Sequence, residues 1–422
     1  MFKELKIIKL VVIASFFVYI ILASFNKFNI STYFFSSGSV EMDASMNLYV
    51  ASNYAEKEKE LVVKDLSGNY IKSIEVNLMS NVVFDKNNDY LSIGYPVENS
   101  FVFNVDQIKK SGIYTLENSP FVVKSKEKVD ITIVYPFVNN HFYTQTNDGY
   151  FFNEEKTHLS LNREMPIDKY TLGMARYFSY LDSSYSTKYI TDLDLENENN
   201  FFNSKMVIIY GRSSFWTAKM RKNLLKYFNE GGNILMITSK TLDTKLWVNK
   251  EQNTARTVEV DKEQNKLNIE TWGLNKKESP FNKTALTSKY GGSAVNIYRS
   301  EYSILVKEHP IFKGLAGSKI PVEGRNFMGT LIRWQDSIPI AEDLSLINNP
   351  DVSKLKVEIL AYSYCKGLYE NSNGGIFIIK QNNNSGKIIS LGTEDWCLKK
   401  NQGKKEITSV TTNAVRYLLE EN

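Results

Sequence analysis

Polar and apolar residues alternate over short distances in the first part of the chain. Between residues 40 and 127, short runs such as 70–76 show this alternation and are separated by turns such as 67–69. Closely spaced runs with no helical period predict a small, antiparallel, Ig-like β-sandwich over residues 40–127. This region offers no paired acids, nucleophile or metal cluster in its sequence, so we expect it to act as a packing or spacer module.

The pattern changes at residue 128. Three nearly continuous apolar runs, 129–135, 205–210 and 233–238, are separated by helical patterns at 170–181 and 216–228. Strands that are apolar throughout are buried on both faces, and their alternation with helices predicts a parallel sheet covered by helices. We therefore expect a doubly wound, mostly parallel α/β domain over residues 128–422.

Further segments extend this predicted domain. The polar stretch 245–300 predicts an irregular insertion. The other expected elements are a weaker strand at 188–191, later strands at 357–362, 375–380 and 386–392, and a final helix at 411–420.

An uncharged apolar segment lies near the start of the chain. It comprises residues 10–25, preceded by Lys3, Lys6 and Lys9 and followed by Lys27. With its flanks it is just long enough to cross a bilayer, and the lysines before it keep the leading end in the cytoplasm. We predict that residues 1–27 form an anchor or signal segment. Within it, residues 7–27 would anchor the protein in the membrane. The protein would then be a single-pass cell-membrane protein with an exported C-terminal ectodomain. The alternatives are a cleaved signal, which would make the protein secreted, and a buried core helix.

The composition excludes several classes of protein. Of 422 residues, 42% are hydrophobic and 23% are charged, which is typical of a globular protein with more than one domain. The net charge of +4 is spread along the chain, so we expect no nucleic-acid partner. Three histidines are too few for a histidine-rich metal site. Cys365 and Cys397 could pair in an exported chain or remain two buried thiols.

Doubly wound sheets bind their ligands outside the carboxyl ends of the strands. Here that rule selects the loops 136–150, 192–200, 211–216, 239–247 and 392–397. The side chains that we expect at this ligand-binding edge are Asn140, His141, Arg212, Trp216 and Trp247.

Two of these loops carry candidate catalytic residues. Ser213 and Ser214 lie between a strand and a helix, where a serine could cradle an anion, cap the helix or act as a nucleophile. A nucleophile elbow would need glycine where Phe215 stands. Glu394 and Asp395 are paired acids at a strand end, but adjacent side chains of an extended segment point to opposite faces and make a poor acid–base pair.

Five segments resemble one known family in order and spacing. They are the loop 136–149 with Tyr143, the loop 211–217, the glycine pair before Asn233, and residues 374–377 and 392–396. Over about residues 110–420 they resemble the large (beta) subunit family of N,N-dimethylformamidase. The resemblance implies a class I glutamine-amidotransferase-like (flavodoxin-like) α/β domain, often preceded by a β-sandwich.

The same resemblance implies an amide hydrolase with a mononuclear iron held by two tyrosines and a glutamate. Tyr143 falls on the first tyrosine, and Tyr185 or Tyr189 is the expected second ligand. If the family glutamate belongs to the 211–217 loop, its place is taken by Ser214, with Ser213 in place of the preceding acid. A neutral serine supplies neither the charge nor the basicity that ferric iron needs from a carboxylate. We therefore expect the iron site to be absent or rebuilt.

Three hypotheses for the function follow. The first is a membrane-anchored, non-catalytic protein that binds a ligand or partner, still unidentified, at the former active-site edge. The second is a hydrolase of an amide or related C–N bond, in which these tyrosines hold a metal with Glu394, Asp395 or Asp192. The third is a carbohydrate-binding or envelope-assembly factor, which rests on export and on aromatic loops.

Overall fold

The computed structural model describes the chain from its first β-strand to its last helix, with gaps. The described residues are 32–36, 38–52, 58–76, 94, 99–105, 108–143, 158–163, 165–239, 244–257, 295–296, 301–327, 330–333, 356–366, 371–380 and 383–420. The predicted anchor at residues 7–27 lies outside them. Within the described ranges, no helix is long and apolar enough to cross a membrane.

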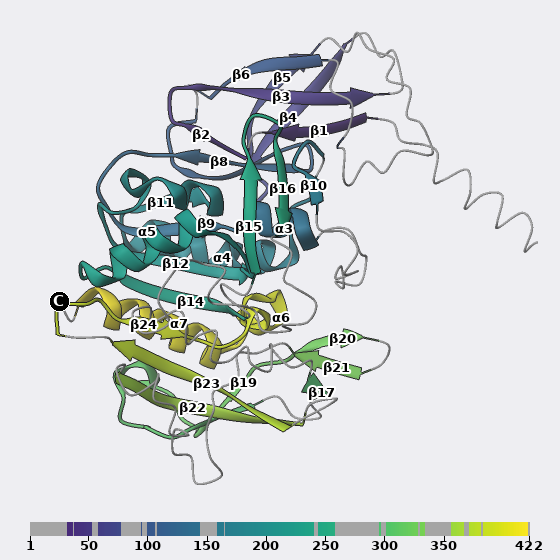
Figure 1. Ribbon diagram of the computed structural model, residues 1–422. Helices are drawn as coiled ribbons and strands as arrows, with labels where there is room; N and C mark the ends of the chain where they lie inside the picture. The colour runs from purple at the N-terminus through teal and green to yellow at the C-terminus, as the bar shows by residue number, and fades with distance from the viewer. Residues whose placement is uncertain are drawn as a thin grey trace, which may run out of the picture.

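The N-terminal strands form two sheets packed face to face (Figure 1). In β4, Leu61 and Val63 point into the core that the two sheets share, where they meet Leu48 of the opposite sheet. One sheet has the order β2 (Ser39–Glu41), β8 (Ser119–Lys124), β7 (Gly112–Leu116), β4 (Lys59–Asp65) and β5 (Tyr70–Val76). The other has the order β1 (Thr32–Ser36), β3 (Ser45–Ser52) and β6 (Asn99–Asn104).

A mixed sheet forms the centre of the second part of the chain. Its first five strands are parallel, in the order β11 (Thr187–Thr191), β9 (Val129–Tyr135), β12 (Ser204–Arg212), β14 (Asn233–Ser239) and β24 (Ile388–Ser390). Antiparallel strands extend it in the order β23 (Asn371–Lys380), β22 (Lys356–Lys366), β18 (Glu301–Ile304) and β19 (Lys319–Pro321). The α/β class and its parallel sheet are therefore confirmed, but the parallel arrangement is limited to one half of the sheet.

Helices cover both faces of the parallel half. In β12, Ile208 and Tyr210 pack in the cluster that contains α4 (Lys169–Ser184) and α7 (Lys405–Glu420). Val207 and Ile209 pack in the cluster that contains α5 (Ala218–Asn229). Because alternate residues meet different helices, the strand must be apolar throughout, as its sequence is.

Short elements follow the carboxyl ends of the parallel strands. Helix α3 (Phe137–Tyr143) follows β9, where the sequence predicts a loop. The others are the 3-10 helices η1 (Asp192–Glu196), η2 (Glu198–Asn200) and η8 (Glu394–Cys397), and helix α6 (Lys399–Gln402).

A smaller sheet stands beside this end of the central sheet. Its strands are β10 (His158–Ser160), β16 (Thr254–Thr257), β15 (Thr244–Asn249) and β13 (Phe215–Thr217). In Figure 1 the β15–β16 hairpin rises toward the β-sandwich. The predicted irregular insertion at 245–300 therefore begins with a hairpin, and residues 258–294 and 297–300 lie outside the described ranges. The remaining elements are η7 (Pro310–Phe312), β17 (Val295–Asn296), β20 (Arg325–Phe327) and β21 (Thr330–Arg333).

Candidate functional site

Asp192, the first residue after β11, organises the start of helix α3. Its carboxylate accepts hydrogen bonds from the backbone N–H groups of Val138 at 3.0 Å, Asn139 at 3.1 Å and Leu193 at 3.0 Å. The side-chain amide of Asn139 donates a fourth bond at 3.0 Å. Burial raises the pKa of Asp192 to about 6, and these hydrogen bonds oppose that shift. Asp192 is thus a helix cap supplied from a distant loop, with its oxygens already engaged.

Asn139 joins two of the loops at this edge. Its side-chain oxygen accepts a bond from the N–H of Phe215 at 2.8 Å, and its amide donates to the carbonyl of the same residue at 3.0 Å. This pairing fixes the loop after β12 to helix α3. No local sequence pattern marks Asn139 for this role, because its partners lie 53 and 76 positions away.

Tyr143, Ser214 and Arg212 meet at the end of helix α3. The hydroxyl oxygens of Tyr143 and Ser214 are 2.7 Å apart. The guanidinium carbon of Arg212 lies 4.4 Å from the centre of the Tyr143 ring and 5.6 Å from that of Tyr170. Arg212 is only half-buried, and its Nη1 donates to the backbone carbonyl of Tyr143 at 3.5 Å. The arrangement presents a positive charge held between two aromatic rings, next to a pair of hydroxyls.

A second buried network lies behind this group. Asp168 caps helix α4 by accepting bonds from the N–H groups of Tyr170 at 2.9 Å and Thr171 at 3.0 Å. The amide of Asn140 donates to Asp168 at 2.7 Å, so Asn140 supports α4 and is buried. An aspartate directly before a helix is a recognisable N-cap signal, and it could have identified Asp168 from the sequence.

Two of the predicted edge residues are buried in the core. Trp216 is fully buried under α5, and its indole N–H donates to the carbonyl of Ser213 at 2.7 Å. His141 is buried, with Nδ1 2.9 Å from the carbonyl of Phe137, and burial lowers its pKa to about 3. Neither side chain is accessible to a ligand, because Trp216 packs under α5 and His141 is enclosed within the buried helix α3.

The serines do not cap the following helix. Thr217 caps α5, and its hydroxyl accepts the N–H of Met220 at 3.2 Å. Ser213 and Ser214 instead precede the short strand β13, and both are buried. The helix-cap interpretation of these serines is therefore wrong.

The remaining predicted residues are spread around the edge. Glu394 and Asp395 are buried in η8, which begins four residues after the end of β24. Trp247 lies on the β15–β16 hairpin with 47% of its surface exposed, and the guanidinium of Arg256 stacks over it at 4.8 Å. Successive side chains of this strand point to opposite faces, so Trp247 is exposed while the neighbouring Leu246 is buried.

Comparison with known proteins decides the family. A sequence model described as N,N-dimethylformamidase beta subunit-like, C-terminal, matches residues 98–405, well over half of the chain. The chain belongs to the N,N-dimethylformamidase beta subunit-like family. No curated protein matches it. Among solved structures it is similar to the "mmIFT52 N-terminal domain" at 13% identity, over 69% of this chain and 98% of that one, with a TM-score of 0.36. A likeness this distant supports no conclusion about function.

The donors expected for a family-type iron do not fit this chain. Tyr143 follows the carboxyl end of β9, whereas Tyr185 ends α4 before β11 begins, at the opposite edge of the sheet. The five residues of β11 correspond to a separation of about 17 Å along the strand. Tyr189, within β11, donates its hydroxyl to Asp182 on α4 at 3.0 Å.

The carboxylates do not rebuild the site either. The loop 211–217 brings the neutral Ser214, not a carboxylate, to the hydroxyl of Tyr143, and Asp192 is engaged as a cap. Throughout the described ranges, no group of three or more His, Cys, Asp or Glu residues could hold a metal ion. The expected set of Tyr143 with Tyr185 or Tyr189 is therefore not brought together.

Cys397 is a free, buried cysteine in η8. Its thiol lies 3.5 Å from the carbonyl of Ile237, and burial raises its pKa well above the ordinary value. The structure therefore has Cys397 unpaired, while the side chain of Cys365 lies outside what is described.

Proposed function

We propose that this chain is a non-catalytic member of the dimethylformamidase-like family that binds an anionic group at the carboxyl edge of its sheet. The observation that carries the proposal is the position of Arg212 between the rings of Tyr143 and Tyr170, 4.4 Å and 5.6 Å away. Aromatic faces orient a guanidinium without neutralising it, so its N–H donors remain able to pair with a carboxylate or phosphate.

The hydroxyl pair beside Arg212 supports the same chemistry. Tyr143 and Ser214 share a 2.7 Å hydrogen bond beside Arg212. Neither hydroxyl carries a negative charge, so the pair does not repel an anion that contacts Arg212. A glutamate at position 214 would repel such a ligand, whereas serine accepts it.

The loss of catalysis is supported by the groups around this pair. General acid–base chemistry would require a titratable side chain within hydrogen-bond reach of the hydroxyls, and a family-type iron would require a carboxylate ligand. Asp192 holds three hydrogen-bond donors at the start of α3 and the N–H of Leu193, and Asp168 holds the start of α4. Both acids are thus occupied by groups whose release would weaken the helices.

Titration with simple anions tests this proposal. The full chain should bind succinate or inorganic phosphate in calorimetry, and Arg212→Gln should weaken binding by about tenfold or more. Arg176→Gln is the matched control, because Arg176 is exposed on α4. Equal binding by wild type and Arg212→Gln, or no binding of any anion, would contradict the proposal.

We further propose that the protein is exported and held at the cell membrane by residues 7–27. The support is the uncharged segment 10–25 with lysines before it. The protein should remain with membranes after alkaline extraction, and a protease added outside the cell should degrade it. Release of a shortened chain into the medium would instead indicate a cleaved signal.

A second candidate function comes from the family itself. The name of the family indicates hydrolysis of a C–N bond in an amide. Under this alternative the purified chain would release dimethylamine from N,N-dimethylformamide, and it would contain iron. Absence of both supports the binding function.

A further inference from the structure

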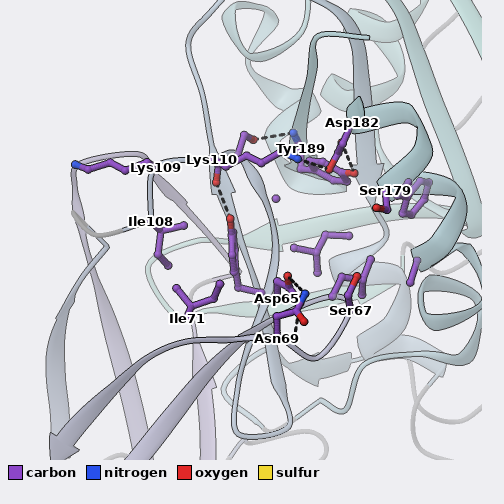
Figure 2. A pocket seen from close by; sticks show the side chains of 17 residues that line it. Asp65, Ser67, Asn69, Ile71, Ile108, Lys109, Lys110, Ser179, Asp182 and Tyr189 are labelled. Atoms are coloured by element: carbon purple, nitrogen blue, oxygen red, sulfur yellow. Dashed lines mark hydrogen bonds and ion pairs between the residues drawn. The ribbon is translucent and has the colours of Figure 1, made fainter. Parts of the chain in front are cut away.

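A cleft separates the β-sandwich from helix α4, away from the edge site (Figure 2). Its volume of about 440 Å³ falls within the range of ligand-binding cavities, about 300–1,000 Å³. One wall is formed by the turn between β4 and β5 and by residues 108–114. The other is formed by α4 and by Tyr189 of β11.

Polar contacts hold the two walls in place. Lys110 of the sandwich forms an ion pair with Asp182 of α4 at 2.9 Å. Asp182 also accepts hydrogen bonds from the hydroxyls of Thr187 at 2.6 Å and Tyr189 at 3.0 Å. The backbone N–H of Tyr189 donates to the hydroxyl of Ser111 at 2.9 Å. The cleft is therefore bounded by fixed groups from both parts of the chain.

The charges that line the cleft balance one another. Two lysines and two aspartates line it. Lys110 and Asp182 are paired with each other, and Lys109 is paired with Asp43 at 3.3 Å and points away from the other lining side chains in Figure 2. Asp65 accepts the backbone N–H and the amide of Asn69 at 2.8 and 2.9 Å. A ligand with a large net charge would find no excess of opposite charge here.

Groups of mixed polarity remain directed at the cleft. The carboxylate of Asp65 has further acceptor capacity beyond its two bonds to Asn69. Ser67 and Ser179 bring hydroxyls from opposite walls, while the half-buried Leu66 and Ile71 add apolar surface. The hydroxyl of Tyr114 donates to the carbonyl of Lys110 at 2.9 Å, and burial, aided by nearby Asp65 and Asp182, raises its pKa to about 12. It therefore stays protonated and neutral.

We propose that this cleft binds a small, neutral, polyhydroxylated ligand of the size of a mono- or disaccharide. Ligand hydroxyls both donate and accept, which matches an acceptor such as Asp65 beside the hydroxyls of Ser67 and Ser179. The C–H faces of such a ligand would cover Leu66 and Ile71. A ligand in contact with both walls would also hold the sandwich against α4.

Calorimetry with the full chain tests the proposal, with glucose, N-acetylglucosamine, maltose and chitobiose as probes. At least one probe should bind to the wild type. Ser179→Phe, which fills the cleft from α4, should weaken that binding by about tenfold or more. Ser183→Phe is the matched control, because Ser183 is also exposed on α4 but does not line the cleft.

Two further variants keep the outcome decisive. Ser67→Phe fills the cleft from the opposite wall and should weaken binding in the same way, even if Ser179→Phe does not fold. Arg212→Gln should leave sugar binding unchanged, which separates this cleft from the anion site. The proposal is overturned if no probe binds, or if a folded cleft-filling variant binds as tightly as wild type.

Discussion

The hydroxyl of Tyr143 lies 2.7 Å from that of Ser214. The tyrosine oxygen that the family resemblance offers as a metal ligand is thus paired with a neutral neighbour from the loop after β12. The ring of Tyr143 has a separate role, since it stacks under Arg212. The serine at position 214 therefore changes the chemistry available at the carboxyl edge of the sheet.

The Tyr143–Ser214 hydrogen bond should contribute measurably to stability. We expect Tyr143→Phe and Ser214→Ala each to lower the free energy of unfolding by about 1 kcal/mol, with a coupling energy of about 0.5–1.5 kcal/mol in the double variant. Urea denaturation measures these values. The exposed pair Tyr70 and Ser73, whose oxygens are 3.3 Å apart, provides the control and should show almost no coupling. Additive effects at Tyr143 and Ser214 would argue against the bond.

Asp192 should give the protein a distinctive dependence on pH. Burial raises its pKa to about 6, so between about pH 4 and pH 6 the folded state binds a proton that the unfolded state has released. The contribution of this carboxyl to stability therefore falls as the pH rises through this window. The difference in free energy of unfolding between wild type and Asp192→Asn should fall by about 2–3 kcal/mol from pH 4 to pH 7.

An aspartate at the opposite end of the parallel strands offers the control for that measurement. The pKa of Asp130 is lowered, chiefly by its hydrogen bond with Lys205, so above about pH 5 this carboxyl is charged in both the folded and the unfolded state. The difference in free energy of unfolding between wild type and Asp130→Asn should therefore stay constant as the pH rises from about 5 to 7. The outcome that would contradict this prediction concerns the difference in free energy of unfolding between wild type and Asp192→Asn. If that difference stays constant or rises with pH, Asp192 is not protonated in the folded protein near pH 5.

Gly173 should be irreplaceable in helix α4. A Cβ at this position would lie 2.0 Å from the carbonyl oxygen of Cys397 and 2.8 Å from the backbone nitrogen of Lys399, and neither backbone atom can move away cheaply. Alanine is favoured over glycine in a helix by about 1 kcal/mol, yet the overlap should cost about 1–3 kcal/mol or more. We expect Gly173→Ala to lower the melting temperature, whereas Ser179→Ala on the exposed side of α4 should not. A rise in melting temperature for Gly173→Ala would refute this close packing.

The buried strands could be predicted because their signal is local. Strands β9, β12 and β14 are apolar on both faces, and the sequence shows this directly. The direction of the later strands could not be predicted in this way. A run such as 375–380 is equally apolar in a parallel or an antiparallel sheet, and β23 pairs in antiparallel fashion with both of its neighbours.

The site was harder to predict because distant contacts create it. Helix α3 follows Pro136, and its first turn is capped by Asp192, 54 positions further along the chain from Val138. Trp216 lies in a predicted ligand loop, but its ring turns into the core under α5. Pattern and spacing located the loops, whereas the direction of each side chain depended on packing that only the folded chain reveals.

The iron content of the purified full chain tests the central claim most directly. The protein should be produced in cells supplied with iron and then measured by elemental analysis, together with Tyr143→Phe. If the edge is a metal-free binding site, both proteins will contain far less than about one iron per chain. Near-stoichiometric iron in wild type that is lost in Tyr143→Phe would contradict this claim and would instead support the hydrolase hypothesis.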